Sequence, residues 1–146
     1  MSATNAFETA ILQLLFTNTN AANVGDATGL RGSTTAGNFW ISLHTADPGE
    51  AGNQSTSEAT YTGYARVSVV RSGSGWTVSG NTASNAAAIN FAACTGGSNV
   101  ITHFGIGSDS TGTGNLFFKG ALTSSLTVSS GITPSFAIGA LTVTDD

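Results

Sequence analysis

From residue 38 onward, large apolar side chains alternate with polar ones, which is the spacing of a half-buried β-strand. The first run covers residues 38–44, where Phe39, Ile41 and Leu43 share one face. Similar short runs, separated by Gly-rich turns, follow at residues 64–71, 76–78, 87–91, 100–107, 116–122, 126–128, 136–138 and 141–143. Strands of this length and spacing are typical of a sandwich or jelly roll. We therefore expect an all-β fold built as an antiparallel β-sandwich or jelly roll.

The connections between these runs carry signals of their own. Ser-Gly-Ser-Gly at residues 72–75 predicts a hairpin that joins the strand at 64–71 to the strand that begins at Trp76. The polar segment that follows the Pro48-Gly49 turn, up to Tyr61, has no periodicity and is expected to be an exposed loop. The expected core consists of Phe39, Ile41, Leu43, Val67, Val69, Trp76, Ile89, Phe91, Phe104, Ile106, Leu116, Phe118, Phe136, Ile138 and Leu141.

Ahead of the strands, the apolar spacing is helical. Residues 5–16 predict one amphipathic helix, with Asn5 as its cap and Glu8 completing a capping box. Its apolar stripe, at i, i+4, i+7 and i+8, consists of Phe7, Ile11, Leu14 and Leu15. A helix of about three turns is marginal alone, so this stripe must be buried against another surface. That surface is either the domain's own sheet or a neighbouring subunit, and the stripe is the candidate interface.

A polar connector at residues 17–37 separates the helix from the strands, and it is long for an internal loop. We expect two parts, an N-terminal helix and extended arm in residues 1–37 and a β-sandwich domain in residues 38–146. Because the alternating core starts at Asn38, the β domain is expected to stay folded without the arm. Residues 25–32 have a Gly spacing that suggests a phosphate loop, but they lack its lysine, so no nucleotide site is expected.

Charge is sparse, and this excludes several classes of function. Only 8% of the 146 residues are charged, and the net charge is −4. The four basic residues, Arg31, Arg66, Arg71 and Lys119, are spread along the chain. Nucleic-acid binding needs clustered Lys and Arg, so neither DNA nor RNA is an expected partner. No apolar run approaches the roughly 20 residues of a spanning helix, so no membrane partner is expected either.

The N-terminus and the cysteine content indicate a chain made in a reducing cytoplasm. A signal peptide would have basic residues before its first apolar run, and this chain has none there. Cys94 is the single cysteine and cannot form an internal disulfide. It follows Phe91 and two alanines, so we expect a small buried side chain rather than a reactive thiol.

Groups that carry enzyme chemistry are few. A triad could combine Cys94 or a serine with His44 or His103 and with Asp47, but serines are so abundant that such a match has almost no specificity. Hydrogen bonding near strand ends is the favoured use of both imidazoles. We expect no catalytic residue, and the chain is not expected to be an enzyme.

Metal ligands are equally sparse. The two histidines and Cys94 do not make a zinc set. Four loop acids, Asp47, Glu50, Glu58 and Asp109, lack the regular spacing of a calcium loop. Solvated loop acids are the favoured interpretation, and no metal or cofactor is expected.

Several stretches resemble a family of small structural proteins of tailed-bacteriophage virions. They are residues 42–52 (SLHTADPGEAG), 61–69 (YTGYARVSV), 101–107 (ITHFGIG), 116–122 (LFFKGAL) and 136–141 (FAIGAL). The similarity covers most of residues 38–146. It implies a non-catalytic virion protein, made in the cytoplasm of a bacterial host, and brings no active-site residues.

Within a virion, two placements compete. A short, self-contained domain without repeats or a coiled-coil stem favours a capsid decoration (cement) protein that binds the major capsid protein and stabilises the shell. The alternative is a tail or tail-fibre component involved in host attachment. In either placement we expect a homo-oligomer, a homotrimer first, that contacts other virion proteins.

A further alternative is a carbohydrate-binding β-sandwich module. Its sugar-stacking residues would be Trp40, Tyr61, Tyr64 and Trp76. Aromatic residues on strands are more often core or interface residues, so this alternative ranks below the two virion placements.

Overall fold

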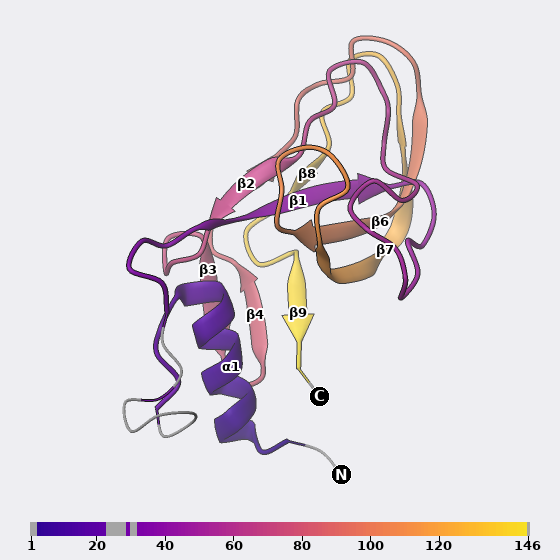
Figure 1. The fold of residues 1–146 in the computed structure, drawn as a ribbon. Helices are drawn as coiled ribbons and strands as arrows, with labels where there is room; N and C mark the ends of the chain where they lie inside the picture. The colour runs from indigo at the N-terminus through magenta and orange to yellow at the C-terminus, as the bar shows by residue number, and fades with distance from the viewer. Residues whose placement is uncertain (1–2, 23–28, 30–31, 146) are drawn as a thin grey trace. The chain divides into compact units, whose positions relative to one another are not determined.

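The computed structural model describes residues 3–22, 29 and 32–145 and shows a mostly β chain with one N-terminal helix (Figure 1). In these residues the elements are α1 (Asn5–Thr17), β1 (Asn38–His44), β2 (Val67–Val70), β3 (Trp76–Ser79), β4 (Thr82–Asn85), β5 (Ile89–Asn90), β6 (Asn99–Gly107), β7 (Leu116–Val128), β8 (Ser135–Phe136) and β9 (Thr142–Thr144). They form three small antiparallel sheets, ordered β2-β1-β6-β7, β3-β4-β9 and β5-β8. None of these sheets closes on itself, and the sandwich or jelly-roll arrangement stays a prediction.

The chain divides into two compact units. The first comprises Met1–Asn38, Val69–Ile89 and Phe136–Asp146, and the second comprises Phe39–Ser68 and Asn90–Ser135. The boundaries fall inside β1, β2, β5 and β8. Whether residues 1–37 act as an arm on an autonomous domain of residues 38–146 stays a prediction. Residues 25–28, 30 and 31 of the Gly-rich stretch lie outside the described residues.

In the first unit, α1 packs on β3 and β4 (Figure 1). Phe16 of the helix meets Trp76 of β3 edge to face, with ring centroids 4.7 Å apart. Both side chains are fully buried, and Leu12 lies one turn before Phe16 on the same buried face. Burial of aromatic side chains of this size contributes several kcal/mol, on the order of 3–5 by substitution. The core of this unit therefore joins the helix to the sheet.

Both ends of α1 differ from a simple capping pattern. The helix begins at Asn5, and Thr4 is its cap residue but makes no side-chain capping hydrogen bond, so the expected capping box of Asn5 and Glu8 is wrong. At the other end Asn18 adopts the left-handed conformation. The Arg71 guanidinium donates hydrogen bonds to the carbonyls of the last turn, at Leu14 and Leu15. A cation at this end also complements the helix dipole.

The hairpin of this unit lies later in the sequence than the expected one at residues 72–75. Residues 72–75 do form a turn, in which Ser72 accepts from the backbone N–H groups of Gly75 and Trp76. The strands on either side, β2 and β3, belong to different sheets, so the expected hairpin between them is wrong. Instead β3 pairs with β4, a strand that the alternation did not predict. The two-residue Gly80-Asn81 turn has the positive φ of 59° at Gly80 that such hairpins need.

The second unit is built on a ladder of β1, β6 and β7. Ile41 lies opposite Ile106 in the β1–β6 register, and both side chains are fully buried. The expected strands at 116–122 and 126–128 are one 13-residue strand, β7. Its ladder with β6 is irregular, however, because Ala121 pairs with His103 and the next pair joins Leu126 to Ile101. The gap in the apolar pattern thus marked a bulge rather than a break between strands.

Most of the expected core is confirmed, with one clear exception. Ile138 is 70% exposed, because it lies beyond the short strand β8 in a turn. Val67, Val69, Phe104, Leu116, Phe118 and Phe136 are half-buried. The core also includes residues that the strand pattern missed, namely Leu12, Phe16, Tyr61, Ala83, Ile101, Val128 and Val143. No helix in the described part of the chain is long and apolar enough to cross a membrane.

Candidate functional site

The segment between β1 and β2 covers β1 in the second unit rather than projecting as an exposed loop. Gln54 and Tyr61 within it are 0% and 3% exposed, which contradicts the expectation from its polarity. Backbone hydrogen bonds fix it along β1, from Thr45 N–H to the Ser57 carbonyl and from Ala59 N–H to the Leu43 carbonyl. The expectation holds only in part, because Asp47, Glu50, Ser55, Ser57 and Thr60 are exposed while Gln54 and Tyr61 are buried.

A buried ion pair holds this segment to a second loop. The Arg66 guanidinium binds both carboxylate oxygens of Glu58, at 2.6 and 2.7 Å. It also donates to the carbonyls of Asp109 and Gly112 in the loop before β7. The Arg66 side chain is 2% exposed and that of Glu58 is 17% exposed, so the pair is shielded from solvent. Hydrogen bonding to Glu58 raises the pKa of Arg66, which therefore stays charged.

Tyr64 links the ion pair to β1. Its hydroxyl donates to Glu58 Oε1 at 2.8 Å and accepts from the Leu43 N–H at 3.0 Å. Burial raises the pKa of Tyr64, so the phenol stays protonated and can donate. The ring lies in an aromatic cluster with Tyr61 and Phe91, at centroid distances of 5.4 and 6.2 Å.

His44 and Ser42 form a hydrogen-bonded pair that has the appearance of a catalytic dyad. His44 Nδ1 lies 2.8 Å from the Thr56 carbonyl, which can only accept, so Nδ1 carries the proton. The Ser42 hydroxyl then donates to Nε2, also at 2.8 Å. Both side chains are fully buried. A Cβ on Gly105, the partner of Ser42 on β6, would lie within 2.6–2.8 Å of the same two side chains, so the glycine leaves room for them.

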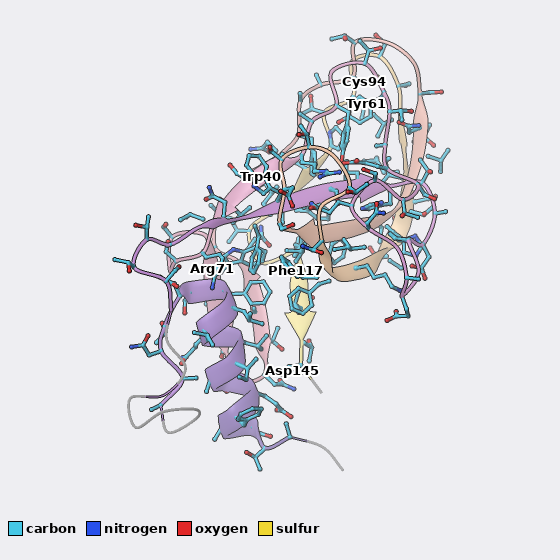
Figure 2. The ribbon with its side chains drawn as sticks, in the orientation of Figure 1. Trp40, Tyr61, Arg71, Cys94, Phe117 and Asp145 are labelled. Carbon is cyan, nitrogen blue, oxygen red and sulfur yellow. The ribbon has the colours of Figure 1, made fainter. Side chains whose placement is uncertain are left out.

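The other parts of the hypothetical triad lie apart from this pair. Cys94 is buried, as expected, and its thiol donates to the Gly96 carbonyl at 3.3 Å. Figure 2 shows Cys94 beside Tyr61, where the strand-like contact of Thr62 with Gly96 holds their two segments together. The carboxylate of Asp47 instead forms an ion pair with Lys119. Among the described triad candidates, the structure therefore joins His44 to the buried Ser42, and it brings neither Cys94 nor Asp47 to that imidazole.

Burial also determines the protonation of His44. Desolvation lowers the pKa of His44 below its ordinary value of 6.5. The Thr56 carbonyl and the charge of Glu58 oppose this shift, whereas the charges of Arg66 and His103 add to it. Because the folded pKa lies below the unfolded one, folding favours the neutral imidazole. This contribution to stability is fully present above a pH of about 6.5 and is lost as the pH falls through the lowered pKa.

We expect His44→Gln to flatten the pH dependence of stability between pH 8 and 5. One proton changes the free energy of unfolding by at most about 1.4 kcal/mol per pH unit. As the pH is lowered below about 6.5, the urea midpoint of the wild type should decrease more steeply than that of the variant. Parallel curves for the two proteins would show that His44 does not titrate on unfolding.

Three of the four loop acids form ion pairs. Lys119 Nζ lies 3.0 Å from Asp47 and 3.1 Å from Glu50, and Glu58 belongs to the buried pair with Arg66. Hydrogen bonds from the Gly49 N–H and from Lys119 lower the pKa of Asp47. Within residues 3–22, 29 and 32–145, no group of three or more His, Cys, Asp and Glu side chains could hold a metal ion.

The second unit also carries an exposed apolar strand edge. β7 is the last strand of its sheet, and Phe117 on it is 51% exposed (Figure 2). Phe117 occupies a bulge, since Phe118 pairs with Ile106 and Leu116 with Gly107, and its ring leans on Phe39 at 5.9 Å. Further along, Leu126 is 37% exposed and Val100 on β6 is 49% exposed. We call the outer side of β7 the β7 edge.

The stripe expected on the helix is only partly covered within its own unit. Phe7 is 45% exposed, and Ile11, Leu14 and Leu15 are half-buried. The helix packs instead through the face of Leu12 and Phe16. As a candidate interface, the stripe stays a prediction.

The aromatic residues considered for sugar stacking do not form a platform. Trp76 is fully buried and Tyr61 is 3% exposed, so their ring faces are not accessible to a ligand. Tyr64 is half-buried and its ring stacks on Phe91, and Trp40 is also half-buried. The carbohydrate-binding alternative therefore lacks the exposed aromatic residues that it requires.

Comparison with models of known protein families gives a match over nearly the whole chain. The family model described as "Podophage GP4 fiber I protein gp80" matches residues 2–144, which includes parts of both units. No curated protein matches the chain.

Proposed function

The chain belongs to the family of the podophage GP4 fiber I protein gp80, and we propose on this basis that it is a non-enzymatic structural component of a podophage tail fibre. The observation that carries the proposal is the length of the match, since residues 2–144 include every described element. The match also confirms the resemblance to tailed-phage virion proteins that motifs between residues 42 and 141 indicated.

The geometry supports a structural role. The Ser42–His44 pair is fully buried, and His44 holds the segment that follows β1 through the Thr56 carbonyl. The buried Glu58–Arg66 pair likewise fixes loops. The exposed features are apolar side chains, among them Phe7, Val100 and Phe117, and these suit contact with other proteins.

Membership of a fibre family favours the tail-fibre alternative over capsid decoration, which the sequence had ranked first. That ranking relied on the short chain and on the lack of repeats or a coiled-coil stem. These features are equally compatible with one small part of a fibre assembled from several proteins. We propose contacts with further fibre subunits and with itself, in place of the major capsid protein, and a contribution to host attachment.

Virions assembled without this chain test the placement. We expect such particles to keep their DNA and their heat resistance, because the shell is intact, but to adsorb to host cells at least tenfold more slowly than complete particles. Adding back the purified chain should restore adsorption. Particles that adsorb normally but release DNA at a lower temperature would instead support capsid decoration.

A further inference from the structure

We propose that His44 is an acid-sensitive latch, which holds residues 45–60 against β1 while its imidazole is neutral and releases them when the imidazole binds a proton. We call residues 45–60 the covering segment. This inference goes beyond the proposed function, because it assigns a conformational change to the chain itself, whichever virion proteins the chain contacts.

The first observation is that His44 lies beneath the covering segment. Its side chain is fully buried, and its Nδ1–H donates to the carbonyl of Thr56, a residue of that segment, at 2.8 Å. The covering segment contains no regular strand and makes an isolated bridge to His44 at Glu58. By contrast, β6 pairs with β1 continuously from Trp40 to His44. Water therefore reaches the imidazole at the lowest cost where the covering segment lifts, since fewer backbone hydrogen bonds must break there.

The second observation is that the closed site has no place for a second proton. The Ser42 hydroxyl donates to Nε2 of His44 at 2.8 Å, so a proton on Nε2 would turn the hydroxyl hydrogen away from its acceptor. Ser42 is fully buried as well. A buried positive charge and a buried hydroxyl without its acceptor both cost free energy. The closed segment therefore favours the neutral imidazole.

The third observation concerns the ionisable groups that act on His44 from the two elements packed against it. On the side of the covering segment, the Glu58 carboxylate favours a charged imidazole, but it is already bound by the Arg66 guanidinium, whose charge opposes one. On β6, His103 lies directly opposite His44 in the register, and its charge also opposes one. Burial is the main cause that lowers the pKa of His44, and these two positive groups add to it.

Proton binding and opening are therefore linked. In the open segment His44 is in contact with water, where its pKa returns toward the ordinary value of 6.5. Because the closed segment holds the pKa below that value, lowering the pH through 6.5 favours the open segment. The equilibrium constant for opening rises by at most about tenfold for each pH unit, and it levels off below the lowered pKa.

Hydrogen exchange between pH 7 and 5 tests the latch. The amides of Thr45, Gln54 and Ala59 report on the covering segment, because each donates to a backbone carbonyl. After correction for the intrinsic pH dependence of exchange, we expect lower protection factors here than in β6. From pH 7 to pH 5 they should fall by about fivefold or more.

The two histidines of the chain provide the variant and its matched control. Histidine is the side chain whose ordinary pKa lies between pH 5 and 8, so other side chains contribute little in this range. His44→Gln keeps a polar side chain that does not titrate, and it should remove the pH dependence of protection in the covering segment. His103→Gln should keep most of it.

Three results would overturn the proposal. One is equal protection in the covering segment and in β6, which would show that the segment opens only when the whole unit unfolds. Another is protection in the segment that does not change with pH, which would show that opening leaves His44 buried. The third is a pH dependence that persists in His44→Gln or disappears in His103→Gln. If His44→Gln does not fold, His103→Gln still decides, because His44 is then the one histidine left in the chain.

Discussion

Phe16→Ala should lower the free energy of unfolding by about 3–5 kcal/mol, the largest effect that we expect from one truncated side chain. The Phe16 ring is fully buried and meets Trp76 at 4.7 Å, so its removal leaves a cavity between α1 and β3. Urea denaturation followed by tryptophan fluorescence would measure the change, since Trp76 reports on this core directly.

The matched control is Phe7→Ala, on the same helix. Phe7 is 45% exposed, so its truncation removes little buried area and should cost well under about 1.5 kcal/mol in the isolated chain. Equal effects of the two substitutions would show that α1 does not pack on β3 as described.

A truncation that removes residues 1–37 tests the predicted arm and domain. The measurement is whether residues 38–146 keep a cooperative unfolding transition.

Arg66→Gln should destabilise the second unit by about 3–5 kcal/mol. The substitution leaves the Glu58 carboxylate without its cation and removes the donors to the Asp109 and Gly112 carbonyls. A buried charge without a partner costs more than the pair itself contributes, so the loss is large even though the net value of an ion pair is modest. Thermal and urea unfolding would both report it.

Lys119→Gln provides the comparison for this prediction. Lys119 also binds two carboxylates, Asp47 and Glu50, but it does so at the surface, where water and salt screen the charges. Its substitution should change the unfolding midpoint very little. If Arg66→Gln is as mild as Lys119→Gln, then the Glu58–Arg66 pair is not shielded in solution.

Local periodicity was enough to predict most of the strands. Phe39, Ile41 and Leu43 alternate strictly, and they are buried on β1, which lies between β2 and β6 in its sheet. The helix was also predictable, but not the face that it buries. Apolar side chains cover more than one side of α1, and only the position of Trp76 decides that Leu12 and Phe16 point inward.

The polar interior was not predictable, because it depends on contacts between distant segments. Glu58 lies in a stretch without periodicity, whereas Arg66 lies in the alternating run at residues 64–71, and the carbonyls that complete their site belong to residues 109 and 112. A weak signal existed, since the chain has only 4 basic residues and one of them precedes an apolar strand. The edge position of β7 is likewise a property of sheet order, which no local pattern encodes.

Electron microscopy of virions labelled with gold-conjugated antibodies against this chain tests the central claim most directly. The account predicts label on the tail fibres of intact particles and none on the shell. Label distributed over the capsid, with fibres left unlabelled, would contradict it.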